Sequence, residues 1–93
     1  MIEQAGDRLR VTVPMVIGNA RALLEAGRAR LGAGENVVDL AAVDESDSSA
    51  LTVIFAWARS VQAPGSSLRI VNPPASMLSL AELYGVAEFL PLA

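Results

Sequence analysis

The stretch VDESDSSALTVIFAWAR, residues 43–59, changes from acidic and hydroxyl side chains to almost wholly apolar ones directly after Ser49. If the segment is helical, one face collects apolar side chains at helical spacing: Ala50, Leu51, Ile54, Phe55, Ala58 and Val61. For that face to reach a core, the helix must begin close to Ser48, and Pro64-Gly65 ends it. We therefore predict a core helix over residues 48–62 with a polar amino end.

This polar amino end has two interpretations. Asp47, Ser48 and Ser49 occupy the cap and first turn, where backbone N–H groups lack partners within the helix and negative charge is favoured. As simple caps, such residues contribute about 1 kcal/mol to stability. Residues 44–49, however, carry six oxygen-bearing side chains where one or two are enough for capping. A hydroxyl at this place can also accept a phosphoryl group, which adds about −1.5 to −2 charge.

The opposite face of the same helix is a candidate docking surface. Small or apolar side chains point away from the inferred core, namely Ser49, Val53, Ala56 and Ser60, and Trp57 lies on the flank. Tryptophan is enriched in interface hot spots, so we predict a partner-binding surface here. Its residues are Asp47, Ser48, Ser49, Val53 and Trp57. In the alternative interpretation, Trp57 packs on a neighbouring helix of its own domain.

The rest of the chain alternates between strand and helix patterns. Residues 9–13 alternate apolar and polar side chains, and Gly6-Asp7 predicts a hairpin turn back to a short strand at residues 2–4. Further segments are a helix over residues 18–31, strands over 37–40 and 67–71, and a third helix opened by Asn72-Pro73-Pro74 and capped by Gly85. The order ββαβαβα predicts one small α/β domain over residues 1–93, with a mixed, mostly parallel sheet of about four strands and three main helices.

Two expectations concern the faces of the flanking helices. Gly27 falls on the apolar face of the first helix, where we expect it to pack closely against the sheet. The apolar face of the third helix is expected to consist of Met77, Leu78, Ala81 and Tyr84.

The composition argues against several classes of function. The chain has no His and no Cys, which removes the commonest general base, the usual metal ligands and the cysteine nucleophile. We therefore predict no catalytic residues and no enzyme activity. The net charge is −3, and the seven basic residues are scattered, so no basic stripe can follow a phosphate backbone. Nucleic acid is not expected as a partner.

Neither a metal site nor a cofactor site is predicted. The acidic residues from Asp39 to Asp47 lack the spacing of a calcium loop, and Gly32-Ala33-Gly34 follows a helix, whereas a phosphate-binding loop precedes one. The first residues mix both charge signs and do not read as a signal peptide. No apolar run approaches the roughly 18 residues of a membrane span, so we expect a cytoplasmic protein.

Two neighbouring motifs carry a family resemblance. They are Val38-Asp39-Leu40 followed by Val43, and Asp47-Ser48-Ser49-Ala50-Leu51. Together they resemble the STAS domain, the family of bacterial anti-sigma-factor antagonists and sulfate-transporter tails, whose pattern is a strand ending in D-L and then D-[ST]-[SGT]-G-L opening a helix. The resemblance implies that Ser48 is the phosphorylated residue, with Ser49 as the second choice. The chain departs from the pattern at Ala50, where Gly is usual.

The carboxyl-terminal part is similar to one branch of this family. Residues 80–86 read LAELYGV, and Phe89-Leu90-Pro91 follows, as at the end of MlaB-type STAS domains. This resemblance implies a non-enzymatic cytoplasmic subunit, peripheral to the inner membrane only through its complex. It would bind and regulate the ATPase of an ABC transporter for phospholipid trafficking, which maintains outer-membrane lipid asymmetry. The alternative is an anti-sigma factor antagonist regulated by serine phosphorylation, with a serine kinase among its partners.

Overall fold

The computed structural model describes residues 1–92 and has the element order expected from the sequence. The elements are β1 (Ile2–Ala5), β2 (Arg8–Val11), α1 (Ile17–Arg30), β3 (Glu35–Asp39), α2 (Ser48–Ser60), β4 (Ser67–Val71), α3 (Ala75–Leu83) and the short 3-10 helix η1 (Ala87–Phe89). The four strands form one sheet in the order β1-β2-β3-β4. β1 is antiparallel to β2 and the other neighbours are parallel, so the predicted mixed α/β sheet is confirmed.

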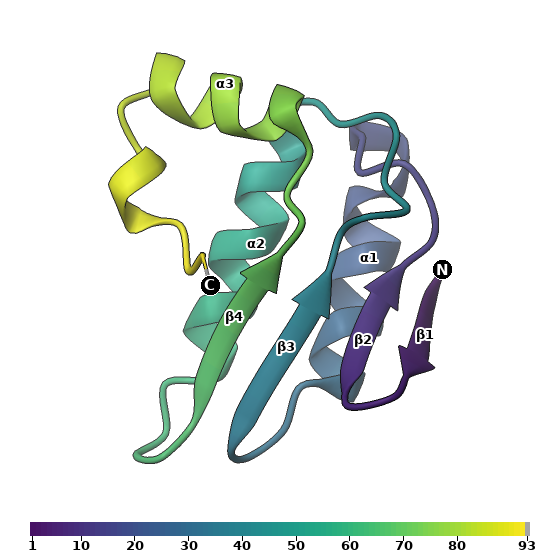
Figure 1. Cartoon of the computed structure of the whole chain (residues 1–93), viewed down its shortest axis with the longest axis vertical. Coiled ribbons are helices and arrows are strands. Elements are labelled where there is room, and N and C mark those ends of the chain that lie inside the picture. The colour runs from purple at the N-terminus through teal and green to yellow at the C-terminus, as the bar shows by residue number, and fades with distance from the viewer. Residues whose placement is uncertain (93) are drawn as a thin grey trace.

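α1 and α2 lie on one face of the sheet, and α3 lies across the end at which β4 finishes (Figure 1). Because β2, β3 and β4 follow one another in one direction across the sheet, right-handed crossovers place both connecting helices on the same face. Each helix follows the carboxyl end of a strand. The amino ends of all three helices therefore gather at one end of the sheet.

The core lies between the sheet and these two helices. Leu9, Val38 and Ile70 are register partners on three neighbouring strands, and all three are buried. The predicted core face of α2 is largely confirmed, because its residues Leu51 and Ile54 are buried in this core. The other members of that face are buried (Ala50 and Val61) or partly buried (Phe55 and Ala58).

The contact between α1 and α2 is built around Trp57. Its side chain is 1% exposed, and its indole Nε1 donates a hydrogen bond to the carbonyl oxygen of Leu24 in α1 at 3.2 Å. Gly27 faces the ring so closely that a Cβ there would lie 2.2 Å from Cε2 and Nε1 of Trp57. The expected contact of Gly27 with the sheet is therefore wrong, because its neighbour is the indole of α2. The interpretation that Trp57 packs on a helix of its own domain is confirmed.

α3 ends in the predicted glycine turn. Gly85 has a φ of +72°, which favours glycine, and its N–H donates to the carbonyl oxygen of Glu82 at 3.0 Å. The N–H of Val86 donates to the carbonyl oxygen of Ala81 at 2.9 Å, which completes a Schellman cap. The turn reverses the chain and leads it into η1.

The exposure of α3 differs from the prediction at one residue. Met77 and Ala81 are buried as expected, but Tyr84 is 56% exposed. Tyr84 is the C-cap, at the point where the chain leaves the helix, and the helical spacing that assigns it to the apolar face no longer applies there. Beyond η1, the N–H of Ile70 donates to the carbonyl oxygen of Pro91 at 2.7 Å, so the tail covers the outer edge of β4.

Candidate functional site

The loop before α2, residues 44–49 and here called the cap loop, joins the amino ends of two helices through one carboxylate. Asp47 is the N-cap of α2, and its Oδ1 accepts a hydrogen bond from the backbone N–H of Ser49 at 2.9 Å. Its Oδ2 accepts a hydrogen bond from the backbone N–H of Ile17, the first residue of α1, at 3.0 Å. The N-cap position of α1 is Val16, whose side chain has no acceptor, so Asp47 supplies the one that α1 lacks.

Further hydrogen bonds hold the cap loop in place. The N–H of Met15, between β2 and α1, donates to the carbonyl oxygen of Glu45 at 2.9 Å, and the N–H of Asp47 donates to the carbonyl oxygen of Met15 at 3.1 Å. The hydroxyl oxygens of Ser46 and Ser76 lie 2.8 Å apart, and Ser76 belongs to the first turn of α3. The cap loop is thus fixed against the amino ends of all three helices.

Asp47 is held in its ionised form by its donors. The hydrogen bonds from the Ser49 hydroxyl and from the backbone N–H groups of Ile17 and Ser49 lower the pKa of Asp47, and slight desolvation opposes them. The amino ends of two helices also favour negative charge at this point. The cap loop therefore carries a fixed negative charge at neutral pH.

The two serines of the cap loop differ in their surroundings. Ser48 is exposed at the first position of α2, and its hydroxyl has no hydrogen-bond partner among residues 1–92. Ser49 is partly buried, and its hydroxyl donates to Asp47 Oδ1. Of the two predicted phosphorylation sites, Ser48 has the free and accessible hydroxyl. Phosphorylation of either residue stays a prediction.

The predicted docking strip on the outer face of α2 is wrong for Val53, Ala56 and Trp57, which are all buried. Val53 is 3% exposed and Trp57 is 1% exposed. α2 contacts β4, α1 and α3 on different sides, so this helix has no broad solvent face. Of the predicted partner-binding residues, only Asp47, Ser48 and Ser49 lie together at the surface.

The sequence interpretation missed one surface residue of this site. Ile17 is 76% exposed, and its backbone N–H is bonded to Asp47, so this residue lies directly beside the cap loop. The sequence pattern starts the first helix at Gly18 and leaves Ile17 in a connecting segment with several other apolar residues. No periodicity distinguishes it there from the buried Met15. We call Ile17, Asp47, Ser48 and Ser49 the cap-loop surface.

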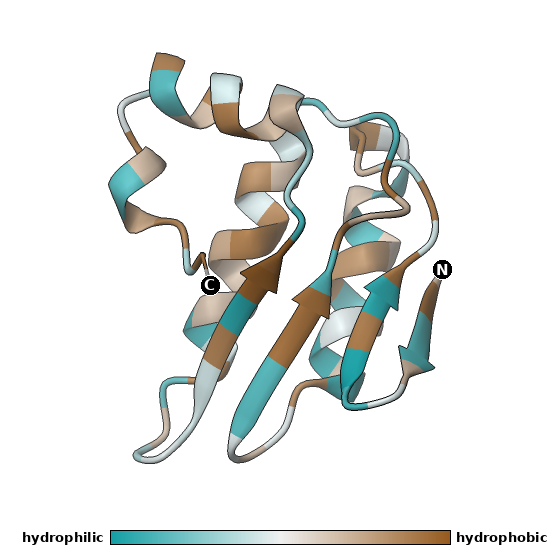
Figure 2. Cartoon of the chain, viewed as in Figure 1, coloured by the Kyte–Doolittle hydropathy of each residue, from teal (hydrophilic) through white to brown (hydrophobic). Residues whose placement is uncertain are grey.

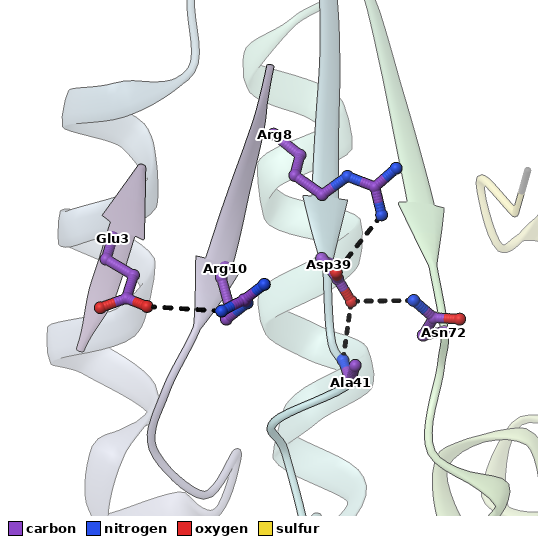
Figure 3. Close-up of polar contacts among 6 residues, drawn as sticks. All are labelled: Glu3, Arg8, Arg10, Asp39, Ala41 and Asn72. Carbon is purple, nitrogen blue, oxygen red and sulfur yellow. Dashed lines mark hydrogen bonds and ion pairs between the residues drawn. The ribbon is translucent and has the colours of Figure 1, made fainter. Parts of the chain in front are cut away.

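The uncovered face of the sheet carries charges that are already paired. Ion pairs join neighbouring strands, with nitrogen–oxygen distances of 3.8 Å for Arg10–Glu3, 3.3 Å for Arg8–Asp39 and 3.6 Å for Arg69–Glu35. Figure 3 shows the first two pairs side by side. Because each arginine on the strands has an acidic partner, this face presents no unpaired basic patch to a charged ligand.

Asp39 is the one buried charged residue in the described part of the chain. Its carboxylate accepts hydrogen bonds from the Ala41 N–H at 2.9 Å, the Asn72 amide at 3.1 Å and Arg8 at 3.3 Å (Figure 3). Burial raises the pKa of Asp39, but these hydrogen bonds and the charge of Arg8 outweigh burial and lower the pKa. Asp39 thus links β3 to β2 and to Asn72, the residue that follows β4, and its role is structural.

Other kinds of site are not found in residues 1–92. The described residues contain no group of three or more acidic side chains placed to hold a metal ion, and no pocket. No helix in this part of the chain combines the length and the apolar sequence needed to cross a membrane. The cap-loop surface is therefore the candidate site on which a function is proposed.

Comparison with known proteins places this geometry in a family. A family model described as "Mlab, STAS domain" matches residues 2–92. The crystal structure of TM1081 from Thermotoga maritima, a candidate anti-sigma factor antagonist, superposes with a TM-score of 0.76 at 18% identity, covering 99% of this chain and 83% of TM1081. The NMR structure of TM1081 gives a TM-score of 0.69 at 18% identity, covering 99% of this chain and 78% of the other. These two likenesses show a shared fold.

A longer protein also contains the fold. The crystal structure of Mglu matches with a TM-score of 0.60 at 29% identity, and the match covers 81% of this chain but 20% of Mglu. No curated protein sequence matches the chain.

Proposed function

The chain belongs to the STAS domain family, and from this premise we propose that it is a non-enzymatic subunit that binds and regulates the ATPase of a phospholipid ABC transporter. The description of the matching family model supports this branch, as does the LAELYGV segment of residues 80–86. In this role the protein is cytoplasmic and reaches the inner membrane only through its complex. Its effect on the ATPase contributes to outer-membrane lipid asymmetry.

The observation that carries the proposal is the exposed Ile17 beside a rigid, charged loop. Ile17 supplies an apolar anchor, and Asp47 with Ser48 supplies a polar border, which is the arrangement of apolar centre and polar rim found in protein interfaces. The cap loop is held by bonds to three helices before any partner arrives. Binding therefore costs little ordering of this loop.

Modification of Ser48 would regulate this surface. A phosphoryl group on Ser48 adds negative charge next to Asp47 at the amino end of α2, where the helix tolerates it. The fold persists, while the surface offered to the ATPase becomes strongly acidic. Phosphorylation is therefore proposed to weaken ATPase binding.

The chemistry of the cap loop favours a binding role over catalysis. Asp47 does contact the hydroxyl of Ser49, as a base would contact a nucleophile. However, a lowered pKa makes Asp47 a weak proton acceptor, and the chain has no His to act in its place. The pair is better explained as a helix cap.

A second candidate function is an anti-sigma factor antagonist with a serine kinase as partner. The free, exposed hydroxyl of Ser48 favours it, because that function needs a serine that a kinase can reach. Mass analysis of the protein from cells distinguishes the two functions. Near-complete phosphate on Ser48, together with no association with an ATPase, would replace the transporter proposal by this one.

Titration of the purified ABC-type ATPase subunit with this chain tests the proposal. The unmodified chain is expected to bind, and Ile17→Gln is expected to weaken binding by about tenfold or more, since losing a hot-spot residue costs about 2 kcal/mol or more. Arg59→Gln, an exposed residue at the opposite end of α2, is the control and should bind normally. No binding by the unmodified chain would refute the ATPase as partner, and full binding by Ile17→Gln would refute the surface.

A further inference from the structure

A second exposed apolar surface lies at the carboxyl end of α3. Leu83, Tyr84 and Phe89 are 75%, 56% and 65% exposed. Leu83 is the last residue of α3, Tyr84 is its C-cap, and Phe89 ends η1 just beyond the turn at Gly85. Together with Ile17, they are the most exposed large hydrophobic side chains among residues 1–92. We call these three residues the terminal apolar surface.

α3 has more apolar surface than its own domain covers. Its sequence, ASMLSLAEL, places apolar residues on most sides, and apolar segments recur along it up to its carboxyl end in Figure 2. In the described residues α3 packs on α2 and η1 and against no strand of the sheet. The long apolar residues before Leu83 are buried or partly buried, and the exposed residues along the helix are Ala75, Ser76, Ser79 and Glu82. The exposed apolar surface of α3 is therefore confined to its carboxyl end, at Leu83 and the residues that follow it.

The charges near this surface identify the kind of partner. Glu82 and Glu88 are the charged residues of α3 and η1, and both are exposed beside it. A second copy of the chain, related by a two-fold axis, would bring like charges together. An anionic membrane surface is disfavoured for the same reason. The complementary surface is an apolar recess bordered by arginine or lysine on another protein.

The two exposed surfaces lie within reach of one partner. Ser76, in the first turn of α3, contacts Ser46 of the cap loop, and the terminal apolar surface begins at the other end of the same helix. The helix has nine residues, and a rise of 1.5 Å per residue makes it about 13 Å long. An interface of common size buries roughly 800 Å² per partner, a patch roughly 30 Å across.

We propose that Leu83, Tyr84 and Phe89 form the second half of the binding surface and insert into an apolar recess with a basic border on the partner. The inference rests on the proposed function, because the partner is taken to be the same ATPase that binds the cap-loop surface. Apolar insertion supplies affinity, while Glu82 and Glu88 pair with the basic border and set the orientation of the complex.

The test is a titration of the purified ATPase subunit with variants of the full chain at low and high salt. The double variant Leu83→Gln/Phe89→Gln is expected to bind about tenfold or more weakly, because exposed anchors are lost. Glutamine is a good helix former, and circular dichroism verifies that the variant is folded. Glu82→Gln/Glu88→Gln is expected to bind more weakly at low salt and to show a smaller salt dependence than the unmodified chain. Arg59→Gln again serves as the control.

The outcomes taken together distinguish a failure of this inference from a failure of the proposed function. Unchanged affinity of Leu83→Gln/Phe89→Gln would overturn the second surface and leave the ATPase proposal standing. No binding by the unmodified chain would overturn both. Sedimentation of the chain alone tests for a dimer, and sedimentation with anionic phospholipid vesicles tests for membrane binding. If the double variant abolishes either association, the surface belongs to a second copy or to the membrane, and the inference is overturned.

Discussion

Replacing Gly27 by alanine should destabilise the protein, although alanine is the better helix former. The added Cβ would lie 2.2 Å from Cε2 and Nε1 of Trp57 and 2.6 Å from its Cζ2. Ordinary contact between carbon atoms requires about 3.5 to 4.0 Å. The indole cannot simply turn away, because it is fully buried and hydrogen-bonded to Leu24. α1 and α2 must therefore move apart.

The size of the destabilisation by Gly27→Ala can be worked out from three effects. Overpacking of a core typically costs about 1 to 3 kcal/mol, and loss of the indole hydrogen bond costs about 1 kcal/mol. The higher helix propensity of Ala than of Gly stabilises the variant by at most about 1 kcal/mol. We expect Gly27→Ala to lower the free energy of unfolding by about 1 to 3 kcal/mol, a large part of the stability of so small a domain.

The assay is urea denaturation followed by circular dichroism, which does not depend on the environment of the single tryptophan. Gly18→Ala is the matched control in the same helix, because a Cβ there has no atom within 4 Å. It should leave stability unchanged or raise it by up to about 1 kcal/mol. In a Trp57→Leu background, Gly27→Ala should lose most of its effect, since the clash is with the indole. Equal stability of Gly27→Ala and the unmodified protein would refute the packing argument.

Three further predictions concern the charged and polar groups. The lowered pKa of Asp39 means that the unfolded chain binds the proton more tightly, so the free energy of unfolding should fall as the pH drops from about 4 through the folded-state pKa. Urea denaturation of Asp39→Asn at several pH values should show a weaker dependence. If the free energy of unfolding of the variant falls as steeply with pH, the role of this carboxylate is contradicted. Asp47→Asn should speed hydrogen exchange at the Ile17 and Ser49 amides, whereas the exposed Asp44→Asn should not; equal exchange in both variants would contradict the double cap. Ser48→Asp should change stability by less than about 1 kcal/mol, yet weaken ATPase binding in a titration, and unaltered affinity would remove Ser48 from the interface.

The fold was accessible from the sequence because local signals agree with one another. The strand at residues 67–71 is observed with the predicted bounds, and Gly85 ends the third helix by the expected backbone conformation. Alternation of strands and helices then leaves few arrangements, since crossovers are right-handed. The role of Asp47 as the cap of α2 also follows from local rules, because its carboxylate accepts the N–H of Ser49, only two residues further along the chain.

The remaining features depend on contacts between distant residues. A two-faced view of α2 assigns Val53 to the solvent face and Trp57 to its flank, but this helix touches the sheet, α1 and α3 and has no broad outer face. The space for Trp57 is created by the missing side chain at Gly27, thirty residues earlier in the chain. In the same way, the bond from Ile17 to Asp47 joins the start of α1 to the cap loop, two segments that local patterns treat separately, so the exposed isoleucine could not be foreseen.

Hydrogen exchange of this chain with and without the purified ATPase subunit tests the cap-loop surface most directly. Binding should slow exchange of amides in residues 15–19 and 45–50, while amides of β1, at the far edge of the sheet, keep their rates. Protection confined to the uncovered sheet face, with unchanged exchange around Ile17 and Ser48, would contradict the account.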